Sequence, residues 1–391
     1  MTSKGNEVNR VGVIGGGQLA WMMSAGAIAL GIDLYIQTPS DEDPAVAIAK
    51  TILAGEVDDA AVTAQLARQC DVITFENEFI DLPALRLLEG QTADGEILFA
   101  PSLDALSPLL DKYDQRLYCD RINLPSPPFT TLERKADLPS LAEKVASIDL
   151  PLALKTRRHG YDGQGTFILK TLREVEAAWE KLDYQPVLLE AFVEFEKELA
   201  VMVARSASGE IAVYPVVETE QIDQVCRRVI APARVEDSIK HEVSAIATTL
   251  INSLEFVGIL GIELFLTAQG KVTLNEIAPR THNSGHYTLD ACSTSQFEQQ
   301  LRAVSNRPLG STELKRPSAV MINLLGTQST ASDYQTKRDA LSQIPDAQVY
   351  WYGKRQSRPG RKMGHVTVLT DSPNDDDVIA EVIQTVENLW Y

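Results

Sequence analysis

Short apolar runs alternate with helix-like segments over the first hundred residues of the chain. The predicted strands are 11–14, 32–36, 71–75 and 97–100, and the predicted helices are 19–30 and 58–68. Gly31 directly follows the first helix, where a glycine commonly ends a helix. Strands that alternate with helices are typical of a parallel sheet covered by helices, with ligands at the carboxyl ends of its strands.

The pattern changes after a stretch rich in proline. A helix is predicted over 104–121, and three prolines within 123–128 indicate a stiff linker. Beyond it the predicted strands are 152–155, 166–170, 187–189, 198–205, 210–217, 261–266 and 271–277, and the predicted helices are 173–182 and 235–255. Ala207-Ser-Gly209 is typical of a hairpin turn between two of these strands.

The composition is that of a folded chain of two or three domains. The 391 residues are 44% hydrophobic and 23% charged, which excludes a disordered protein. The net charge of −18 argues against general nucleic-acid binding. No apolar run is long enough to span a membrane, the first residues lack the apolar segment of a signal peptide, and the four cysteines lie far apart. We therefore expect a reduced, cytoplasmic protein.

A glycine-rich turn lies between the first predicted strand and the first predicted helix. Its Gly15-x-Gly17-x-x-Ala20 spacing fits a dinucleotide-binding turn, where the helix N-terminus binds a phosphate. The second strand carries Gln37 where such a domain usually has an acidic residue for the ribose. A nicotinamide-dependent oxidoreductase and a tight strand-to-helix turn without a ligand are both compatible with this motif.

A second glycine-rich segment runs from Lys155 to Gly165 between two predicted strands. Its three glycines within six residues, with a lysine upstream, can surround phosphate oxygens with backbone N–H groups. No lysine follows Gly165, so the segment is not a Walker A motif. We interpret it as a glycine-rich hairpin that covers a nucleotide, the alternative being an exposed flexible loop.

Two glutamates lie on neighbouring predicted strands, Glu263 on one and Glu276 on the other. A hairpin centred on 269–270 makes them face each other. Facing carboxylates destabilise a sheet unless a cation lies between them, and Mg²⁺ is typical of carboxylates that share a site with substrate phosphates. Asn275 joins them only if the strand has a bulge. A solvated acidic face is the alternative, but the neighbouring strand residues are nearly all apolar.

Two later segments gather basic side chains. The strand predicted over 271–277 is directly followed by Arg280, His282 and His286. An arginine with two histidines favours anion binding and proton transfer. Five basic residues lie within the nine positions 354–362. In so acidic a chain we interpret this second segment as a pocket for a substrate phosphate, with a solvated basic loop as the alternative.

The order of these features resembles the ATP-grasp superfamily. Within it the chain resembles, over nearly its whole length, the 5-(carboxyamino)imidazole ribonucleotide synthase family. The motifs that carry the resemblance are Gly15-Gly-Gly-Gln-Leu, Gly160-Tyr-Asp-Gly-x-Gly165, Asn275-Glu-Ile-Ala-Pro-Arg280-x-His282-Asn-Ser-Gly-His286 and Tyr352-Gly-Lys-x7-Lys-Met-Gly-His365.

The resemblance implies an α/β (α+β multidomain) chain with the ATP-grasp fold. The implied parts are an N-terminal Rossmann-like parallel-sheet domain over 1–110, a linker helix and lid domain over 111–195, a magnesium and ATP domain over 196–310, and a C-terminal extension over 311–391 that carries the substrate-phosphate clamp. A homodimer is also implied.

The activity that the resemblance implies is a ligase that uses ATP and Mg²⁺ to carboxylate 5-aminoimidazole ribonucleotide with bicarbonate, through carboxyphosphate. The implied ATP-binding residues are Lys112, Lys155, Gly160, Tyr161, Asp162, Gly163, Gln164, Gly165, Thr166, Glu190, Ala191, Phe192, Val193, Glu198, Gln221, Asn275 and Glu276. The implied metal ligands are Glu263 and Glu276. The implied substrate-binding residues are Glu76, Tyr161, Asp162, Arg280, His282, Lys354 and Arg361, of which Tyr161, Arg280 and His282 are the catalytic candidates.

Three positions depart from the family pattern. Gln164 replaces a basic residue of the glycine loop, Gln221 replaces a histidine that approaches ATP, and Asn77 is displaced beside Glu76. The metal and phosphate residues are retained, so we expect activity. The alternatives are another ATP-grasp ligase, such as formate-dependent glycinamide ribonucleotide transformylase, and a catalytically silent ribonucleotide-binding protein.

Overall fold

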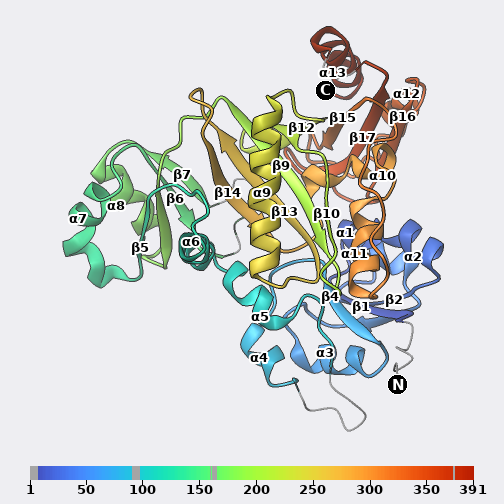
Figure 1. Ribbon diagram of the computed structural model, residues 1–391, viewed down its shortest axis with the longest axis horizontal. Helices are drawn as coiled ribbons and strands as arrows, with labels where there is room; N and C mark the ends of the chain where they lie inside the picture. The colour runs from blue at the N-terminus through green and yellow to red at the C-terminus, as the bar shows by residue number, and fades with distance from the viewer. Residues whose placement is uncertain (1–7, 90–96, 159, 161–164, 373–374) are drawn as a thin grey trace.

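A parallel sheet forms the N-terminal part of the molecule, drawn in blue in Figure 1. The computed structural model describes residues 8–89, 97–158, 160, 165–372 and 375–391. The strand order is β3 (Thr51–Ala54), β2 (Asp33–Thr38), β1 (Arg10–Ile14) and β4 (Val72–Phe75), which confirms three predicted strands. The strand predicted over 97–100 is wrong: Phe99 makes an isolated bridge to Ile73, and Pro101 lacks the amide that would extend the pairing.

Helices that were predicted as continuous are divided in this part of the chain. The segment predicted over 104–121 forms α5 (Leu103–Leu106) and α6 (Lys112–Arg121), because Pro108 lies between them and Asp111 adopts an extended backbone that caps α6. The other helices here are α1 (Gln18–Trp21), α2 (Ser24–Leu30), α3 (Ala60–Ala67) and α4 (Leu82–Arg86). The first two of these replace the single helix predicted over 19–30.

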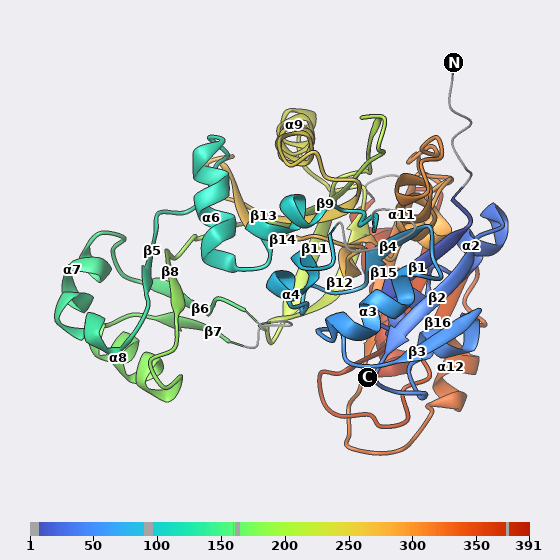
Figure 2. The same cartoon turned by 90° about the horizontal axis from the view of Figure 1, so that it is seen from below.

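The second sheet is antiparallel and belongs to a separate lobe, which we call the lid lobe (residues 129–191), at the left of Figures 1 and 2. Its strand order is β5 (Phe129–Leu132), β8 (Val187–Ala191), β6 (Leu152–Thr156) and β7 (Thr166–Leu169). Its helices are α7 (Leu141–Ala146) and α8 (Leu172–Lys181). The hydrophobic cluster around the fully buried Trp179 contains residues of this lobe alone. A lobe with its own core can move as a unit.

The third sheet is the largest and runs through the middle of the molecule into its C-terminal part. Its strand order is β14 (Val272–Ala278), β13 (Gly258–Leu266), β9 (Lys197–Arg205), β11 (Val217–Ile222), β12 (Val225–Ala231), β15 (Ser318–Leu325), β17 (Lys362–Thr370) and β16 (Ala347–Trp351), with β10 (Ile211–Val213) also paired to β9. Its helices are α9 (Asp237–Ser253), α10 (Thr288–Ala291), α11 (Gln296–Val304), α12 (Gln335–Leu341) and α13 (Asp376–Trp390).

One hydrophobic core joins the parallel sheet to the large sheet. It contains Ile14 and Phe75 of the parallel sheet, Leu199 and Leu260 of the large sheet, and Leu250 of α9. These two sheets therefore form a common base, and Figure 2 shows the lid lobe set to one side of it. No helix in the described part of the chain is long and apolar enough to cross a membrane. The four cysteines are all free thiols, as predicted.

Candidate active site

A cavity of about 1190 Å³ is lined by residues of the lid sheet and the large sheet, together with α1, α6 and the segment that follows β4 of the parallel sheet. The predicted site residues in its wall are Glu76, Lys112, Lys155, Gly160, Thr166, Glu190, Ala191, Phe192, Val193, Glu198, Gln221, Glu263, Asn275, Glu276, Arg280 and His282. Gly165, Lys354 and Arg361, which the structure also describes, are not in that wall. Tyr161, Asp162, Gly163 and Gln164 lie outside the described residues. The structure thus brings most of the described site residues predicted from the sequence into one cavity.

The β13–β14 hairpin brings the two acidic side chains together. Glu263 pairs with Glu276 across the antiparallel strands, which confirms the predicted register at this point. The turn itself is centred on residue 269, since Leu266 pairs with Val272, whereas the prediction placed its centre between 269 and 270. Gly270 adopts a φ of +76°, the left-handed conformation that closes a short hairpin of this kind.

A bulge in β14 restores the predicted pairing. Leu264 faces Leu274 and Glu263 faces Glu276, so Asn275 is the extra residue of the strand. The bulge also turns the Asn275 side chain towards the cavity, where Lys155 Nζ donates a hydrogen bond to Asn275 Oδ1 at 3.0 Å. The bulge that Asn275 needed to join the two glutamates is therefore present.

The acidic side chains of the cavity differ in their proton affinity. Burial and the facing Glu276 carboxylate raise the pKa of Glu263 to about 7. Burial and the nearby Glu263 raise the pKa of Glu198, on β9, to about 7 as well. Burial also acts to raise the pKa of Glu276, but Lys112 Nζ lies 2.6 Å from Glu276 Oε1 and leaves that pKa below its ordinary value. Without a cation between them, the paired carboxylates therefore favour one proton.

A buried charge cluster lies where the lid lobe meets the large sheet. Glu190 Oε2 lies 2.7 Å from Lys155 Nζ, and Glu190 Oε1 accepts a hydrogen bond from the Arg116 guanidinium. Arg116 Nη2 also donates to the Asn275 carbonyl oxygen at 2.5 Å. Burial opposes ionisation of Glu190, but the two cations lower its pKa to about 2. The cluster holds the Lys155 ammonium at the cavity wall.

The glycine turn at the start of α1 binds a carboxylate that belongs to the protein itself. Glu76, which follows β4, accepts hydrogen bonds from the backbone N–H groups of Gly17 (2.6 Å), Leu19 (3.0 Å) and Ala20 (3.3 Å). A Cβ added to Gly17 would lie 2.5 Å from Glu76 Oε1, and one added to Gly15 would lie 2.6 Å from Glu76 Oε2. These glycines admit Glu76, which occupies the position of a dinucleotide phosphate.

Arg280 and His282 extend from the end of β14 into the same cavity. The Arg280 guanidinium binds Glu78 through Nε (2.6 Å) and Nη2 (3.0 Å), and this pairing lowers the pKa of Glu78 against the effect of burial. His282 Nε2 lies 3.8 Å from Glu263 Oε1, and His282 Nδ1 lies 2.9 Å from the Ser284 hydroxyl. The segment after β14 thus adds a cation and an imidazole beside the paired carboxylates.

The basic C-terminal segment presents Lys362 to the cavity. Lys362 is the first residue of β17 and lines the wall. Lys354 Nζ donates to the Lys362 carbonyl oxygen at 2.8 Å, and Arg361 Nη1 donates to the Gln356 carbonyl oxygen at 2.6 Å. Both predicted side chains therefore make contacts within their own segment.

Sequence reasoning did not single out four residues that belong to the site: Arg116, Glu78, Lys362 and Gln115. Arg116 lies one helical turn after Lys112, so the periodicity of α6 places both on one face. Glu78 alternates with Glu76 after the same strand. Lys362 adjoins the predicted Arg361. Nothing in the sequence signals that Gln115 exchanges hydrogen bonds with the backbone of Ile277 at 2.9 and 3.2 Å.

Models of three protein families match successive parts of the chain. A ribonucleotide synthetase preATP-grasp domain matches residues 8–106, an ATP-grasp domain matches 117–297, and a phosphoribosylaminoimidazole carboxylase C-terminal domain matches 319–378. These matches, with the sheets described above, confirm the predicted α/β multidomain ATP-grasp fold.

Similar proteins align over nearly the whole length. The N5-carboxyaminoimidazole ribonucleotide synthase of Synechococcus elongatus is 50% identical over 98% of this chain and 96% of its own. A carboxyaminoimidazole ribonucleotide synthase from Aspergillus clavatus, solved with ATP, has a TM-score of 0.88 at 31% identity over 98% of this chain and 99% of its own. The Aspergillus clavatus enzyme solved with ADP and 5-aminoimidazole ribonucleotide has a TM-score of 0.87 at 30% identity, covering 98% of each chain. The chain belongs to the N5-carboxyaminoimidazole ribonucleotide synthase family of ATP-grasp ligases.

Proposed function

We propose that the cavity catalyses carboxylation of the exocyclic amine of 5-aminoimidazole ribonucleotide by bicarbonate, with ATP as the phosphoryl donor. The products are 5-carboxyaminoimidazole ribonucleotide, ADP and phosphate. The observation that carries the proposal is the pairing of Glu263 with Glu276 beside Lys112 and Lys155 in one cavity. Phosphoryl transfer needs such a fixed arrangement of charge more than it needs a covalent nucleophile.

The donor set around the paired glutamates fits Mg²⁺. Mg²⁺ prefers oxygen ligands and usually takes one or two carboxylates together with substrate phosphates and waters. Glu263 and Glu276 supply the carboxylates, and the Asn275 amide lies beside them because of the bulge. Two carboxylates leave the remaining positions of a bound Mg²⁺ to substrate phosphates and waters. When bound, Mg²⁺ neutralises charge on the transferred phosphoryl group.

The ATP-binding residues are those that the family motifs imply. Lys112 and Lys155 contact the phosphates, and Gly160, Gly165 and Thr166 belong to the loop over them. The adenine slot is formed by Glu190, Ala191, Phe192 and Val193, the ribose is held by Glu198, and Gln221, Asn275 and Glu276 complete the set. The buried side chain of Glu190 supports this assignment indirectly, because it fixes Lys155 and leaves only its backbone for the base.

The ribonucleotide and the carboxyphosphate occupy the part of the cavity around Glu76, Arg280 and His282. Arg280 stabilises the developing anion, and His282 is placed to exchange a proton. Tyr161 and Asp162 are assigned by their motif alone. The family motifs assign Lys354 and Arg361 to the ribonucleotide phosphate, although neither lies in the cavity wall, and Lys362, which does, is the neighbouring cation.

The reaction balances in two steps. A bicarbonate oxygen attacks the γ-phosphorus of ATP, the bond to the β-phosphate oxygen breaks, and carboxyphosphate and ADP form. The bond between the carboxyl carbon and the phosphate oxygen of carboxyphosphate then breaks to give phosphate and CO₂, the amine nitrogen bonds to the CO₂ carbon, and His282 accepts the proton that the amine loses. Carboxyphosphate hydrolyses readily, so the cavity must exclude water while the second step proceeds.

The test is an assay of ADP release and of carboxylated product. We expect ADP release that depends on bicarbonate and is stimulated by 5-aminoimidazole ribonucleotide. ADP release that depends instead on glycinamide ribonucleotide and formate would assign the chain to the transformylase reaction. Absence of turnover with either ribonucleotide would indicate the silent binding protein.

A homodimer stays a prediction that rests on the family resemblance, and a cytoplasmic location stays a prediction that rests on the sequence alone. Sedimentation equilibrium at micromolar concentration tests the first, and a species of about 43 kDa, the mass of one chain, would contradict it.

A further inference from the structure

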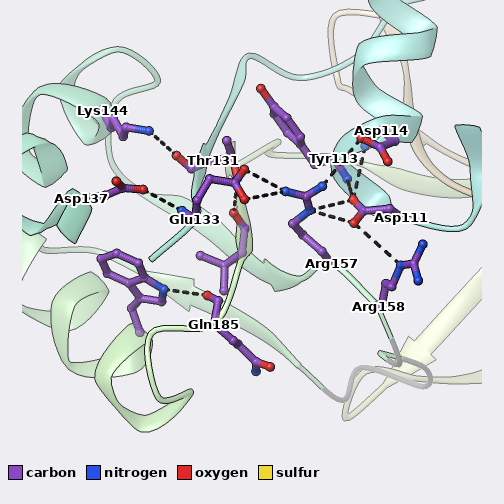
Figure 3. A network of polar contacts seen from close by, with 12 residues as sticks. Asp111, Tyr113, Asp114, Thr131, Glu133, Asp137, Lys144, Arg157, Arg158 and Gln185 are labelled. Atoms are coloured by element: carbon purple, nitrogen blue, oxygen red, sulfur yellow. Dashed lines mark hydrogen bonds and ion pairs between the residues drawn. The ribbon is translucent and has the colours of Figure 1, made fainter. Parts of the chain in front are cut away.

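Arg157 lies at the centre of a network of ion pairs between the lid lobe and α6, and Figure 3 shows three carboxylates around it. Its Nε lies 2.8 Å from both oxygens of Asp111, and its Nη1 lies 2.8 and 3.1 Å from the oxygens of Glu133. Its Nη2 lies 3.7 Å from Asp114 Oδ1, and the guanidinium carbon lies 5.0 Å from the centre of the Tyr113 ring. The Arg157 and Asp111 side chains are 16% and 10% exposed, so their ion pair is shielded from solvent, whereas Glu133 and Asp114 are nearly half exposed.

The backbone of the same residue holds the first turn of α6. Asp111 is the N-cap of that helix, and its Oδ1 accepts hydrogen bonds from the N–H groups of Tyr113 (2.8 Å) and Asp114 (3.3 Å). The N–H of Lys112, which a helix leaves unpaired at its start, donates to the Arg157 carbonyl oxygen at 3.0 Å. The side chain of Arg157 therefore binds the cap residue Asp111, and its backbone carbonyl binds the N–H of Lys112.

The other end of this connection is anchored to the large sheet. Gln115 of α6 bonds to both backbone groups of Ile277, and Lys112 Nζ lies 2.6 Å from Glu276. Arg157 follows β6 directly, and Lys155 of β6 reaches the same cavity. One arginine thus connects the lid strand that carries Lys155 to the helix that carries Lys112.

We propose that Arg157 is a positioning residue for phosphoryl transfer, which sets Lys112 and Lys155 at a fixed separation across the nucleotide site through its ion pair with Asp111. The inference rests on the proposed function, because it takes the two lysines as ATP ligands. Arg157 itself acts through other groups, since its donors are directed at Asp111, Asp114 and Glu133.

The chain offers a matched control in the adjacent Arg158. Its side chain is 52% exposed, and its Nε lies 4.0 Å from Asp111, at the limit of an ion pair. Asp111→Asn is a milder variant than Arg157→Ala, because asparagine keeps the helix cap while it removes the charge that Arg157 binds. It also avoids leaving three carboxylates without their shared cation.

The experiment compares the steady-state kinetics of Arg157→Ala, Asp111→Asn, their double variant and Arg158→Ala. We expect Arg157→Ala and Asp111→Asn each to raise the KM for ATP roughly ten-fold, and the double variant to raise it no further than the larger single effect. We expect Arg158→Ala to stay within about two-fold of the parent. Carboxylated product per ADP should fall in the first three, because a misplaced lid exposes carboxyphosphate to water.

A purely structural role for Arg157 predicts a different result. Loss of folded protein lowers the apparent kcat and leaves the KM for ATP and the product ratio unchanged, and that outcome would overturn the proposal. Calorimetric titration of ATP distinguishes failure of the proposed function from failure of the role proposed for Arg157. If the parent binds ATP but shows no ribonucleotide-stimulated ADP release, the proposed function fails, while weaker ATP binding by Asp111→Asn still supports the role of Arg157.

Discussion

At the scale of single residues, the site depends on charges that neutralise one another out of contact with bulk water. Glu190, Lys155 and Arg116 form a buried cluster in which each cation compensates the carboxylate. Removing one member of such a cluster leaves a buried charge unpaired, and this destabilises the folded chain by more free energy than the intact pair contributes to its stability. The cluster therefore fixes Lys155 firmly in one place.

The lowered pKa of Glu190 predicts how stability depends on pH. The pKa is about 2 in the folded chain against 4.5 ordinarily, so the carboxylate contributes stability that is complete above about pH 4.5 and is lost as the pH falls towards 2. Glu190→Gln should be less stable at pH 7 and should lose less stability over that acid range. Urea unfolding at several pH values measures the difference. Parallel pH profiles for the two proteins would contradict the depressed pKa.

The facing glutamates make a second prediction at this scale. Glu276→Gln keeps the shape of the side chain but removes a negative charge from the proposed metal site, so ATP-dependent turnover should fall by at least about a hundred-fold. The free energy of unfolding should change little, because relief of repulsion with Glu263 offsets loss of the Lys112 ion pair. Glu242→Gln, at an exposed position of α9, is the control. Near-normal ADP release by Glu276→Gln would remove the basis of the metal site.

At the scale of elements, a hairpin could be predicted where a glycine marks its turn in the sequence. The hairpin between β13 and β14 was found because Gly270 marks its turn, and the bulge at Asn275 compensated a small error in the centre of that turn. β12 was missed because its hairpin with β11 turns at Asp223 and Gln224, which adopt positive φ values without a glycine.

Two further differences between prediction and structure have a proline as their cause. The strand predicted over 210–217 forms only β10, which ends at Val213, and β11 begins at Val217. Pro215 lies between them and has no amide to donate. Pro108 divides the predicted helix over 104–121 in the same way. Site residues that act through tertiary contacts, such as Arg116 with Glu190, had no local pattern from which to be predicted.

The bulge predicts a specific role for Asn275. Asn275→Ala keeps the backbone carbonyl that Arg116 binds, but it removes the side-chain oxygen that Lys155 binds. We expect the KM for ATP to rise several-fold, because Lys155 loses one of the two groups that fix its ammonium, and we expect little change in thermal stability, because Glu190 still binds that ammonium. Steady-state kinetics and a thermal unfolding curve test this together. An unchanged KM would show that the amide does not help to place Lys155.

At the scale of the whole molecule, the base of the site and the C-terminal segment share one sheet. β15 pairs with β12, and Glu387 of α13 binds both Arg227 and Arg228 of β12. Trp390 of the same helix is fully buried and donates from Nε1 to the Leu325 carbonyl oxygen at 2.8 Å. The lid lobe, by contrast, has a core of its own.

This continuity predicts the effect of truncation. A chain that ends at residue 310 loses β15, β16 and β17, and β12 becomes an exposed edge whose backbone groups have no partner. We expect that chain to aggregate on expression, whereas the full chain stays monodisperse. Light scattering and circular dichroism distinguish the two. A soluble, cooperatively unfolding 1–310 fragment would show that the last strands are dispensable.

The Glu76 carboxylate in the Gly15–Ala20 turn determines what else that turn can bind. Glu76 neutralises the helix end from within, so a pyrophosphate has to expel it before a redox coenzyme can dock there. Exchanging Gln37 for aspartate would not by itself recruit NAD. In this chain the glycine spacing therefore marks a turn that its own carboxylate already fills, and the spacing is no sign of a dehydrogenase.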